Sequence, residues 1–276
     1  MSDIIHQIFS QHTERISSVG LDEAYLDFSD NSFEQAMCVA QNIKRQIFEQ
    51  TRLIASAGLA PNPYLAKIAS DWKKPNGFFV LQPHEVEAFV EQLPVRTLPG
   101  VGEVTEARLL GLGAKSTGDL RRFGLSFLTQ HFGQYGEVLW ELSHGRDSRD
   151  VFTQGPRRSL SVEHTYIQDL VTLPEWEMAI LDLAQDWKDR LTHYRQDSDD
   201  QRPLKNIFIK LKFSDFKSHT LALPVTETLD PGNTFSKLIQ GAFQKWPNRA
   251  VRLLGVGGHF ISEEHELTEQ QLQLAL

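Results

Sequence analysis

Two adjacent carboxylates, Asp22 and Glu23, are the residues of this sequence best suited to hold a metal ion. They lie in Gly-Leu-Asp-Glu-Ala-Tyr-Leu-Asp (20–27), within a hairpin predicted over residues 19–28. Neighbouring strand residues point to opposite faces, so both side chains reach one site only if a turn or bulge carries them. Two close carboxylates repel unless a cation lies between them, and Mg²⁺ prefers such ligands together with substrate phosphates. The alternative is an acidic turn in solvent.

A lysine, Lys74, follows in the turn sequence Lys-Pro-Asn-Gly (74–77). The proline disfavours helix at the residue before it, and Asn-Gly favours a turn, so the helix predicted over residues 63–70 ends here. A lysine at a fixed turn can hold a triphosphate as a point charge. The purely local explanation of the motif is a helix stop.

A glycine-rich turn, Leu-Pro-Gly-Val-Gly (98–102), precedes a helix predicted to begin at Glu103. Helix, Pro-Gly-Val-Gly turn and helix form the helix-hairpin-helix pattern. At Gly100, Val101 and Gly102 the backbone N–H groups can approach a DNA phosphate, and the dipole of the following helix favours the anion. Such contacts position DNA without reading its sequence. A plain pair of antiparallel helices is the alternative.

Lysines alternate with apolar residues in the strand predicted over residues 206–213. The alternation places Lys210 and Lys212 on the face opposite to the isoleucine, leucine and phenylalanine side chains. An apolar inner face and a basic outer face suit a sheet that lies along DNA phosphates. Further positive charge comes from Arg157, Arg158 and Arg252. Basic outer faces also occur on proteins without this role.

The C-terminal sequence Gln-Gln-Leu-Gln-Leu-Ala-Leu (270–276) alternates between polar and apolar residues. An extended end of this kind can dock in the groove of a partner protein, whereas a frayed terminus needs no role. The residues predicted to make the contact are Gln271, Leu272, Leu274 and Leu276.

Three segments with different patterns would position these residues. Residues 1–82 mix helix and strand patterns, residues 83–149 contain short helices separated by glycines, and residues 159–276 again mix both. Four strands and two helices are predicted in the last segment, over residues 159–166, 173–194, 206–213, 220–225, 233–246 and 252–260. The predicted class is multidomain α+β: a mixed-sheet domain, an all-helical domain, a linker over residues 150–158 and an open sheet with helices on one face.

The composition of the 276-residue chain, with 40% hydrophobic and 23% charged residues, is that of an ordinary globular protein. No apolar run approaches the ~20 residues of a membrane helix, no signal-peptide pattern is present, and a single cysteine excludes internal disulfides. We therefore predict a cytoplasmic monomer without membrane contact. The net charge of −8 opposes DNA binding, although a bound metal or a local basic stripe can offset it. The sequence has no Walker-type loop, Gly-x-Gly-x-x-Gly turn after a strand or Gly-x-Ser-x-Gly elbow, so it does not support kinase or hydrolase function.

Five motifs in a fixed order resemble Y-family translesion DNA polymerases, in particular the bacterial DNA polymerase IV group. They are Leu-Asp-Glu-Ala-Tyr-Leu-Asp (21–27), Ala-Ser-Ala-Gly-Leu-Ala-Pro-Asn (55–62), Leu-Ala-Lys-Ile-Ala-Ser-Asp (65–71), Lys-Pro-Asn-Gly (74–77) and Leu-Pro-Gly-Val-Gly (98–102). The resemblance continues in residues 157–162 and 251–255, which are similar to strands of that family's little finger. The terminal residues 271–276 are similar to its sliding-clamp peptide.

The resemblance implies domains and a role for each site. Residues 1–82 would be part of the palm, residues 83–149 the thumb, and residues 159–276 the little finger with a C-terminal peptide for the bacterial sliding clamp. Asp22 and Glu23 would bind two Mg²⁺ ions, and primer–template DNA would contact the thumb and little finger. The lysine of the Lys-Pro-Asn-Gly turn would hold the triphosphate of the incoming deoxynucleotide. The metals would activate the primer 3′-hydroxyl and neutralise the pyrophosphate in an in-line transfer.

The family pattern also contains an N-terminal strand with another metal-binding aspartate, an aromatic gate against ribonucleotides, and the fingers. None of these is matched before Asp22, and Asp3 is not the missing aspartate because it falls in a predicted helix. We therefore expect a chain that lacks the N-terminal part of the palm and one metal ligand, and that is catalytically impaired. The alternative is a non-catalytic fragment that binds DNA and the sliding clamp.

Overall fold

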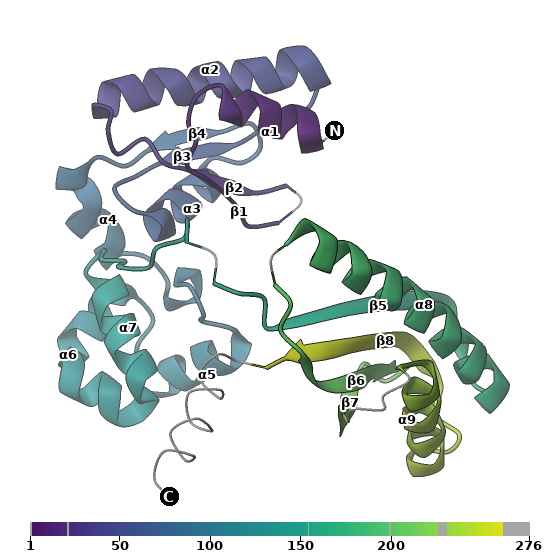
Figure 1. The fold of residues 1–276 in the computed structure, drawn as a ribbon. Helices are drawn as coiled ribbons and strands as arrows, with labels where there is room; N and C mark the ends of the chain where they lie inside the picture. Colours follow the sequence, from purple (N-terminus) through teal and green to yellow (C-terminus); the bar gives the residue numbers. More distant parts are fainter. Residues whose placement is uncertain (1, 21, 154, 199, 226–230, 262–276) are drawn as a thin grey trace, which may run out of the picture. The chain divides into compact units, whose positions relative to one another are not determined.

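The structure is a computed structural model that describes residues 2–20, 22–153, 155–198, 200–225 and 231–261. Two compact units divide the chain, over residues 1–154 and 155–276 (Figure 1). No helix in the described ranges is long and apolar enough to cross a membrane.

The strands of the first unit form two separate pairs. β1 (Ile16–Ser18) and β2 (Ala24–Leu26) run antiparallel, whereas β3 (Ala57–Leu59) and β4 (Phe78–Val80) run parallel. The predicted hairpin is present, but its first strand precedes Val19 instead of beginning there. Both strand directions therefore occur among residues 1–82, but in two separate sheets instead of the one mixed sheet that was predicted.

Two helices pack together beside these strands. α1 (Ser2–Ser10) and α2 (Phe33–Thr51) enclose a small apolar core, with members Ile8, Ile43 and Ile47. α2 begins with a capping box, in which Ser32 and Gln35 each accept a hydrogen bond from the other's backbone N–H.

The helix α3 (Pro63–Trp72) lies directly against β3 because Gly58 has no side chain. A β-carbon on this glycine would be 2.3 Å from the carbonyl oxygen of Ala66 and 2.3 Å from the backbone nitrogen of Ser70. Asn62 starts the helix, with a side chain that accepts a backbone hydrogen bond from the first turn. The close contact fixes the position of α3 over the strand.

Short helices make up the rest of the first unit. They are η1 (Pro83–Glu85), α4 (Val86–Glu91), η2 (Val95–Thr97), α5 (Glu103–Gly111), α6 (Thr117–Phe132) and α7 (Gln134–Ser143). The fully described segment 83–149 contains no strand, as predicted. One buried cluster joins α3 to these helices, with members that include Tyr64, Leu65, Leu81, Leu93 and Leu109. The domain boundary at residue 82 stays a prediction, since both sides share this core.

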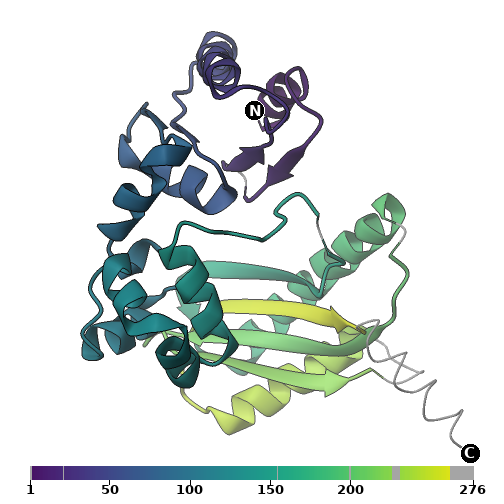
Figure 2. The same cartoon turned by 90° about the vertical axis from the view of Figure 1, so that its left-hand side faces the viewer.

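The second unit is an antiparallel sheet with strand order β5–β8–β6–β7. The strands are β5 (Ser159–Leu170), β6 (Leu204–Phe213), β7 (Ser218–Pro224) and β8 (Val251–Phe260). α8 (Leu173–Asp197) and α9 (Pro231–Lys245) cover one face of this sheet (Figure 2). The buried core between them contains Trp176, Trp187, Ile209, Phe235 and Val256. The predicted four strands and two helices are confirmed.

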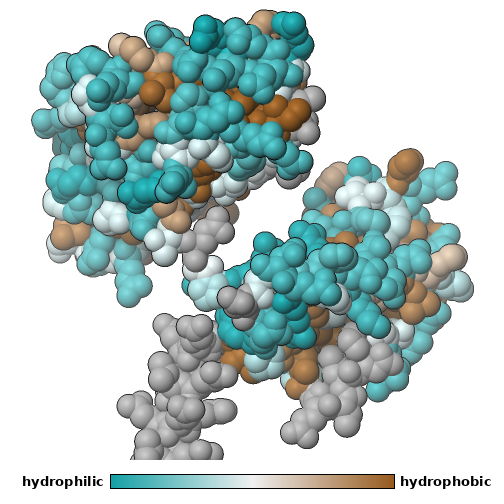
Figure 3. Space-filling model, turned by 45° about the horizontal axis from the view of Figure 1, so that its top comes forward, coloured by the Kyte–Doolittle hydropathy of each residue, from teal (hydrophilic) through white to brown (hydrophobic). Residues whose placement is uncertain are grey.

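The visible surface of each unit is mostly hydrophilic, with apolar side chains in scattered places (Figure 3). Exposed large apolar side chains include Ile54, Val104, Ile167 and Met178. Scattered exposure of this kind is ordinary and identifies no docking surface.

Candidate functional site

The turn between β1 and β2 carries the two predicted metal ligands. The backbone N–H groups of Val19 and Gly20 donate to the carbonyl oxygen of Glu23 at 2.9 and 3.3 Å, which closes the turn. Asp22 is exposed, and 38% of the Glu23 side-chain surface is exposed. Neither residue lies inside a strand, so the alternation of a strand does not force the two carboxylates apart.

The helix α3 meets this turn through Lys67. Its Nζ atom lies 2.5 Å from Oε1 of Glu23, although the two residues are 44 positions apart in the sequence. No role was predicted for Lys67. The available signals were its place in Leu-Ala-Lys-Ile-Ala-Ser-Asp and its spacing of four from Asp71, which puts both side chains on one helix face.

Lys74 lies in the loop after α3, where the negative charges of nearby carboxylates act on its ammonium group. Its Nζ atom lies 2.5 Å from Oδ1 of Asp71. The hydrogen bond and charge of Asp71 raise the pKa of Lys74, and the charges of Glu23 and Asp22 raise it further. Lys74 therefore stays protonated at neutral pH, in the neighbourhood of the predicted metal ligands.

A lysine of α2 holds the loop that carries Lys74. Nζ of Lys44 donates to the carbonyl oxygens of Asn76 and Gly77 at 2.9 and 2.7 Å. Partial burial lowers the pKa of Lys44. Asn76 has a φ of 54°, in the left-handed region that asparagine tolerates, and the Lys74–Pro75 peptide bond is cis. The two hydrogen bonds fix the backbone of the loop.

The donor set at this turn fits a divalent cation that keeps other ligands of its own. Asp22 and Glu23 offer the hard oxygen atoms that Mg²⁺ prefers, and the ammonium group of Lys67 shows that a positive charge fits beside Glu23. Within the described ranges, no group of three His, Cys, Asp or Glu side chains is placed to hold a metal. Mg²⁺ commonly completes its shell with water and phosphate oxygens. The carboxylate pair therefore suits a metal that arrives with a nucleotide.

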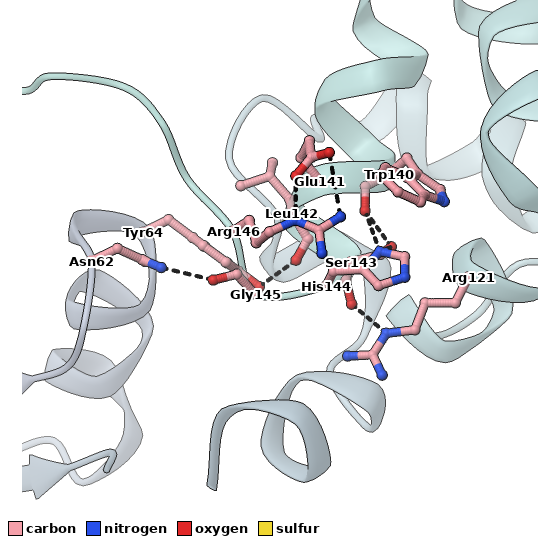
Figure 4. Close-up of polar contacts among 10 residues, drawn as sticks. All are labelled: Asn62, Tyr64, Arg121, Trp140, Glu141, Leu142, Ser143, His144, Gly145 and Arg146. Carbon is pink, nitrogen blue, oxygen red and sulfur yellow. Dashed lines mark hydrogen bonds and ion pairs between the residues drawn. The ribbon is translucent and has the colours of Figure 1, made fainter. Parts of the chain in front are cut away.

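The first turn of α3 is anchored to the end of α7 (Figure 4). Nδ2 of Asn62 donates to the carbonyl oxygen of Gly145 at 2.7 Å, and the Tyr64 hydroxyl donates to that of Leu142 at 3.0 Å. Carbonyl groups at the end of a helix lack partners within the helix, so these donors satisfy them. Burial raises the pKa of Tyr64, which keeps its hydroxyl a donor.

The segment after α7 is tied to the hairpin. Asp147, with 2% of its side chain exposed, accepts two hydrogen bonds of 2.8 Å from the guanidinium of Arg149. Burial by itself raises the pKa of Asp147, but the bonds from Arg149 lower it overall. Burial raises the pKa of Tyr25 in β2, and the charges of Lys67 and Arg149 oppose this rise. The hydroxyl of Ser17 in β1 donates to the carbonyl of Val151 at 2.5 Å, so this segment supports the hairpin at a second place besides the Lys67–Glu23 contact.

The glycine-rich turn before α5 needs glycine at position 100. Gly100 has a φ of +82°, and a β-carbon there would lie 2.7 Å from the Tyr135 hydroxyl. That hydroxyl donates to the carbonyl of Pro99 at 2.8 Å. Val101 is buried, and Gly102 is the residue before α5, with open space around it. The helix before the turn is the short 3₁₀ helix η2.

Acidic residues begin the helix that was predicted to favour a phosphate. Glu103 and Glu106 lie in the first turn of α5, and their charges oppose an anion there. Arg96 lies 3.7 Å from Glu106 and offsets part of that charge. A phosphate contact at this turn therefore depends on the backbone N–H groups more than on local charge.

The predicted basic face of the second unit is present. Buried residues of β6 are Ile207, Ile209, Leu211 and Phe213, while Lys210 and Lys212 lie on the other face. Nζ of Lys210 in β6 forms an ion pair of 2.8 Å with Glu163 in β5. The residue of β8 that lies between them in the sheet is Gly255, which has no side chain to separate the two. Lys212 and Arg252 both lie over the Phe216 ring, at 5.1 and 5.5 Å from its centre.

The remaining predicted residues are close in sequence to the first or last residue of the second unit. Arg157 and Arg158 are exposed, and Arg157 lies 5.3 Å from the centre of the Tyr194 ring. The predicted clamp contacts, Gln271, Leu272, Leu274 and Leu276, lie outside the described residues.

Known protein families match most of the chain. The impB/mucB/samB family matches residues 1–71, its C-terminal domain matches residues 157–274, and a domain described as the DNA polymerase-iota thumb matches residues 96–147. A DNA polymerase IV of Ectopseudomonas mendocina is 42% identical over 275 residues, which cover 99% of this chain and 75% of the relative. One of Legionella pneumophila is 42% identical over 277 residues, with 100% and 75% covered. The chain thus spans about three-quarters of the length of these relatives.

Solved structures agree in fold. A chimeric Y-family DNA polymerase has a TM-score of 0.79 at 23% identity, with 94% of this chain and 74% of that chain covered. The DinB of Sulfolobus solfataricus has a TM-score of 0.54 at 23% identity, with 95% and 76% covered. Similarity at this level of identity establishes the fold, and the relatives at 42% identity establish the family. The chain therefore belongs to the Y family of DNA-directed DNA polymerases.

Proposed function

We propose that the β1–β2 turn and α3 form part of the nucleotidyl-transfer site of a translesion DNA polymerase. Asp22 and Glu23 would hold Mg²⁺, and Lys74 would hold the triphosphate of the incoming deoxynucleotide. The observation that carries this proposal is the 2.5 Å contact between Lys67 and Glu23, which joins the turn with the two carboxylates to α3, the helix that Lys74 follows. When bound, the metal ions would lower the pKa of the primer 3′-hydroxyl and neutralise the leaving pyrophosphate.

The residues of the chain have separate parts in this scheme. The two carboxylates position the cations, and Lys74 balances the negative charge of the triphosphate as a point charge. Lys44 holds the loop that positions Lys74. Because positioning and charge stabilisation supply most of the catalysis in such transfers, small shifts of α3 against the hairpin should reduce the rate strongly.

We further propose that a polypeptide of these 276 residues is impaired in catalysis. The described residues bring two carboxylates to the turn, and no three-donor metal group is present among them. The alternative is that such a polypeptide only binds DNA and the sliding clamp. Catalysis would use the proposed palm (1–82) together with the thumb (83–149) and the little finger (159–276), whereas the alternative would use only the thumb and the little finger.

Primer extension with Mg²⁺ and with Mn²⁺ tests the proposal on catalysis. The expected result is little or no nucleotide incorporation, since two-metal transfer needs a complete ligand set. Any residual activity should disappear in Glu23→Ala, because that variant removes a proposed ligand. Extension as fast as that of a DNA polymerase IV relative, and lost in Glu23→Ala, would contradict the proposed impairment and support the proposed ligand. Extension that Glu23→Ala leaves intact would contradict the proposed site.

DNA binding is proposed for the thumb turn and the basic face of the little finger. The thumb would use the backbone of Gly100, Val101 and Gly102, which leaves base sequence unread. The little finger would use side chains of Lys210, Lys212, Arg252, Arg157 and Arg158. Binding should be independent of sequence and sensitive to salt, because each phosphate contact releases counterions.

The C-terminal residues 271–276 are proposed to bind the bacterial sliding clamp. Gln271 would donate or accept hydrogen bonds at the mouth of an apolar pocket, and the leucines would fill it. Each buried leucine contributes about 1.5–3 kcal/mol before ordering costs, so the affinity of so short a peptide should be modest. The monomeric state and the cytoplasmic location stay predictions from the sequence.

A further inference from the structure

We propose that Lys67 is a placeholder cation, meaning that its ammonium group takes the place of a metal beside Glu23 until a metal arrives with the nucleotide. The inference rests on the proposed function, in which Asp22 and Glu23 hold the metal. It adds an order of binding: a divalent ion alone binds weakly, and the nucleotide triphosphate draws Lys67 away from Glu23.

The Glu23–Lys67 contact has the features of an exchangeable pair. Nζ of Lys67 lies 2.5 Å from a single oxygen of Glu23, and the two side chains are 41% and 38% exposed. Exposed pairs of this kind contribute little to stability and reform easily with other partners. The pair is also not the sole support of the hairpin, because the Ser17 hydroxyl bonds to the carbonyl of Val151.

A second carboxylate–lysine pair lies on the same helix face and loop. Lys74 is held 2.5 Å from Asp71, and Asp71 is one helical turn after Lys67. The cluster thus contains three carboxylates, Asp22, Glu23 and Asp71, and two ammonium groups, with one negative charge in excess. Each lysine is thus paired with a carboxylate, and the phosphate oxygens of a nucleotide would bind its ammonium group more strongly.

The charge balance sets the expected order of events. A lone divalent ion meets a cluster with one excess negative charge and an ammonium group already beside Glu23. A nucleotide triphosphate adds several negative charges, which attract Lys67 and leave Glu23 open to the metal. Neutralising Lys67 should therefore strengthen the binding of a divalent ion alone, and this gain should shrink when nucleotide is present.

Electron paramagnetic resonance of free Mn²⁺, titrated into the full chain without nucleotide, tests this order. Lys67→Gln should bind Mn²⁺ at least about threefold more tightly than the wild type, as expected for loss of an exposed ion pair. Lys67→Arg should match the wild type. Lys73→Gln is the matched control, since it removes one positive charge from the end of the same helix without touching Glu23. Circular dichroism confirms that each variant is folded.

Two further variants separate this inference from the proposed metal site. In the Lys67→Gln background, Glu23→Gln should abolish the gain in Mn²⁺ affinity, and a deoxynucleoside triphosphate should reduce the gain over the wild type. If Mn²⁺ affinity is unchanged or weaker in Lys67→Gln, or rises equally in Lys73→Gln, the placeholder role is wrong while the metal site stands. If Glu23→Gln and Asp22→Asn leave Mn²⁺ binding of the wild type unchanged, with and without nucleotide, the metal site itself is wrong.

Discussion

Replacing Gly58 with alanine is expected to push α3 away from β3. The new β-carbon would lie 2.3 Å from the carbonyl oxygen of Ala66, 2.3 Å from the backbone nitrogen of Ser70 and 2.6 Å from the β-carbon of Ala69. The first two atoms belong to the helix backbone and cannot rotate away. Restoring an ordinary separation of about 3.5 Å requires the helix to move by roughly 1 Å.

The movement has a cost in stability and a cost at the site. Over-packing of this kind lowers the free energy of unfolding by about 1–3 kcal/mol. The same shift displaces Lys67 and the loop with Lys74 relative to Glu23. A misplacement of about 1 Å in a catalytic site reduces the rate by about a hundredfold. Gly58→Ala should therefore weaken both the fold and the Glu23–Lys67 contact.

Hydrogen exchange of the α3 amides, residues 63–72, measures the local effect directly, and urea unfolding measures the global one. Gly111→Ala is the matched control, because it is the same substitution in the same unit at a site with nothing within 4 Å of the added β-carbon. As the last residue of α5, Gly111 should tolerate alanine or gain up to about 1 kcal/mol. The reasoning is wrong if Gly58→Ala exchanges α3 amides no faster than Gly111→Ala does.

Three other outcomes are expected. Lys212→Ala should lower DNA affinity and flatten the dependence of log K on log salt by about 0.9 for one phosphate contact. Lys210→Ala should change this slope less, because Glu163 already balances the charge of Lys210. Equal slopes for the two variants in salt titrations would contradict this. Asp147→Asn should destabilise the fold by about 1–3 kcal/mol at neutral pH. Because folding lowers the pKa of Asp147, that contribution is present above the ordinary aspartate pKa and lost as the pH falls through the folded value, so the wild type and variant should converge in acid unfolding. Deleting residues 271–276 should abolish binding to purified sliding clamp and leave DNA affinity nearly unchanged; undiminished clamp binding would show that this end has no such role.

Much of the site follows from local sequence. The hairpin with Asp22 and Glu23 and the turn after α3 depend on residues next to one another, so their patterns predict them. The first strand was nevertheless placed too late, and β4 (Phe78–Val80) was not predicted. Strands of three residues show too little alternation for the pattern to place them.

The pairings of side chains required the fold. Lys67 meets Glu23 only because α3 packs closely on β3 at Gly58. Lys210 meets Glu163 because β8 lies between β5 and β6, with a glycine where the two side chains cross. Neither strand order nor helix packing can be read from the spacing of charged residues. The alternation of lysines with apolar residues therefore predicted the correct face of the sheet. It overestimated the unbalanced positive charge on that face, because it could not show that Glu163 pairs with Lys210.

The most direct test of the central claim is a double-mutant cycle on the binding of a Mn²⁺–deoxynucleoside triphosphate complex. Its corners are the wild type, Glu23→Gln, Lys74→Gln and the double variant, and its readout is calorimetric affinity. If Glu23 holds the metal and Lys74 the phosphates of the same bound complex, each single change should weaken binding, and the double variant should lose less than the sum of the two. Losses that add independently, or unchanged affinity in either single variant, would contradict a shared site.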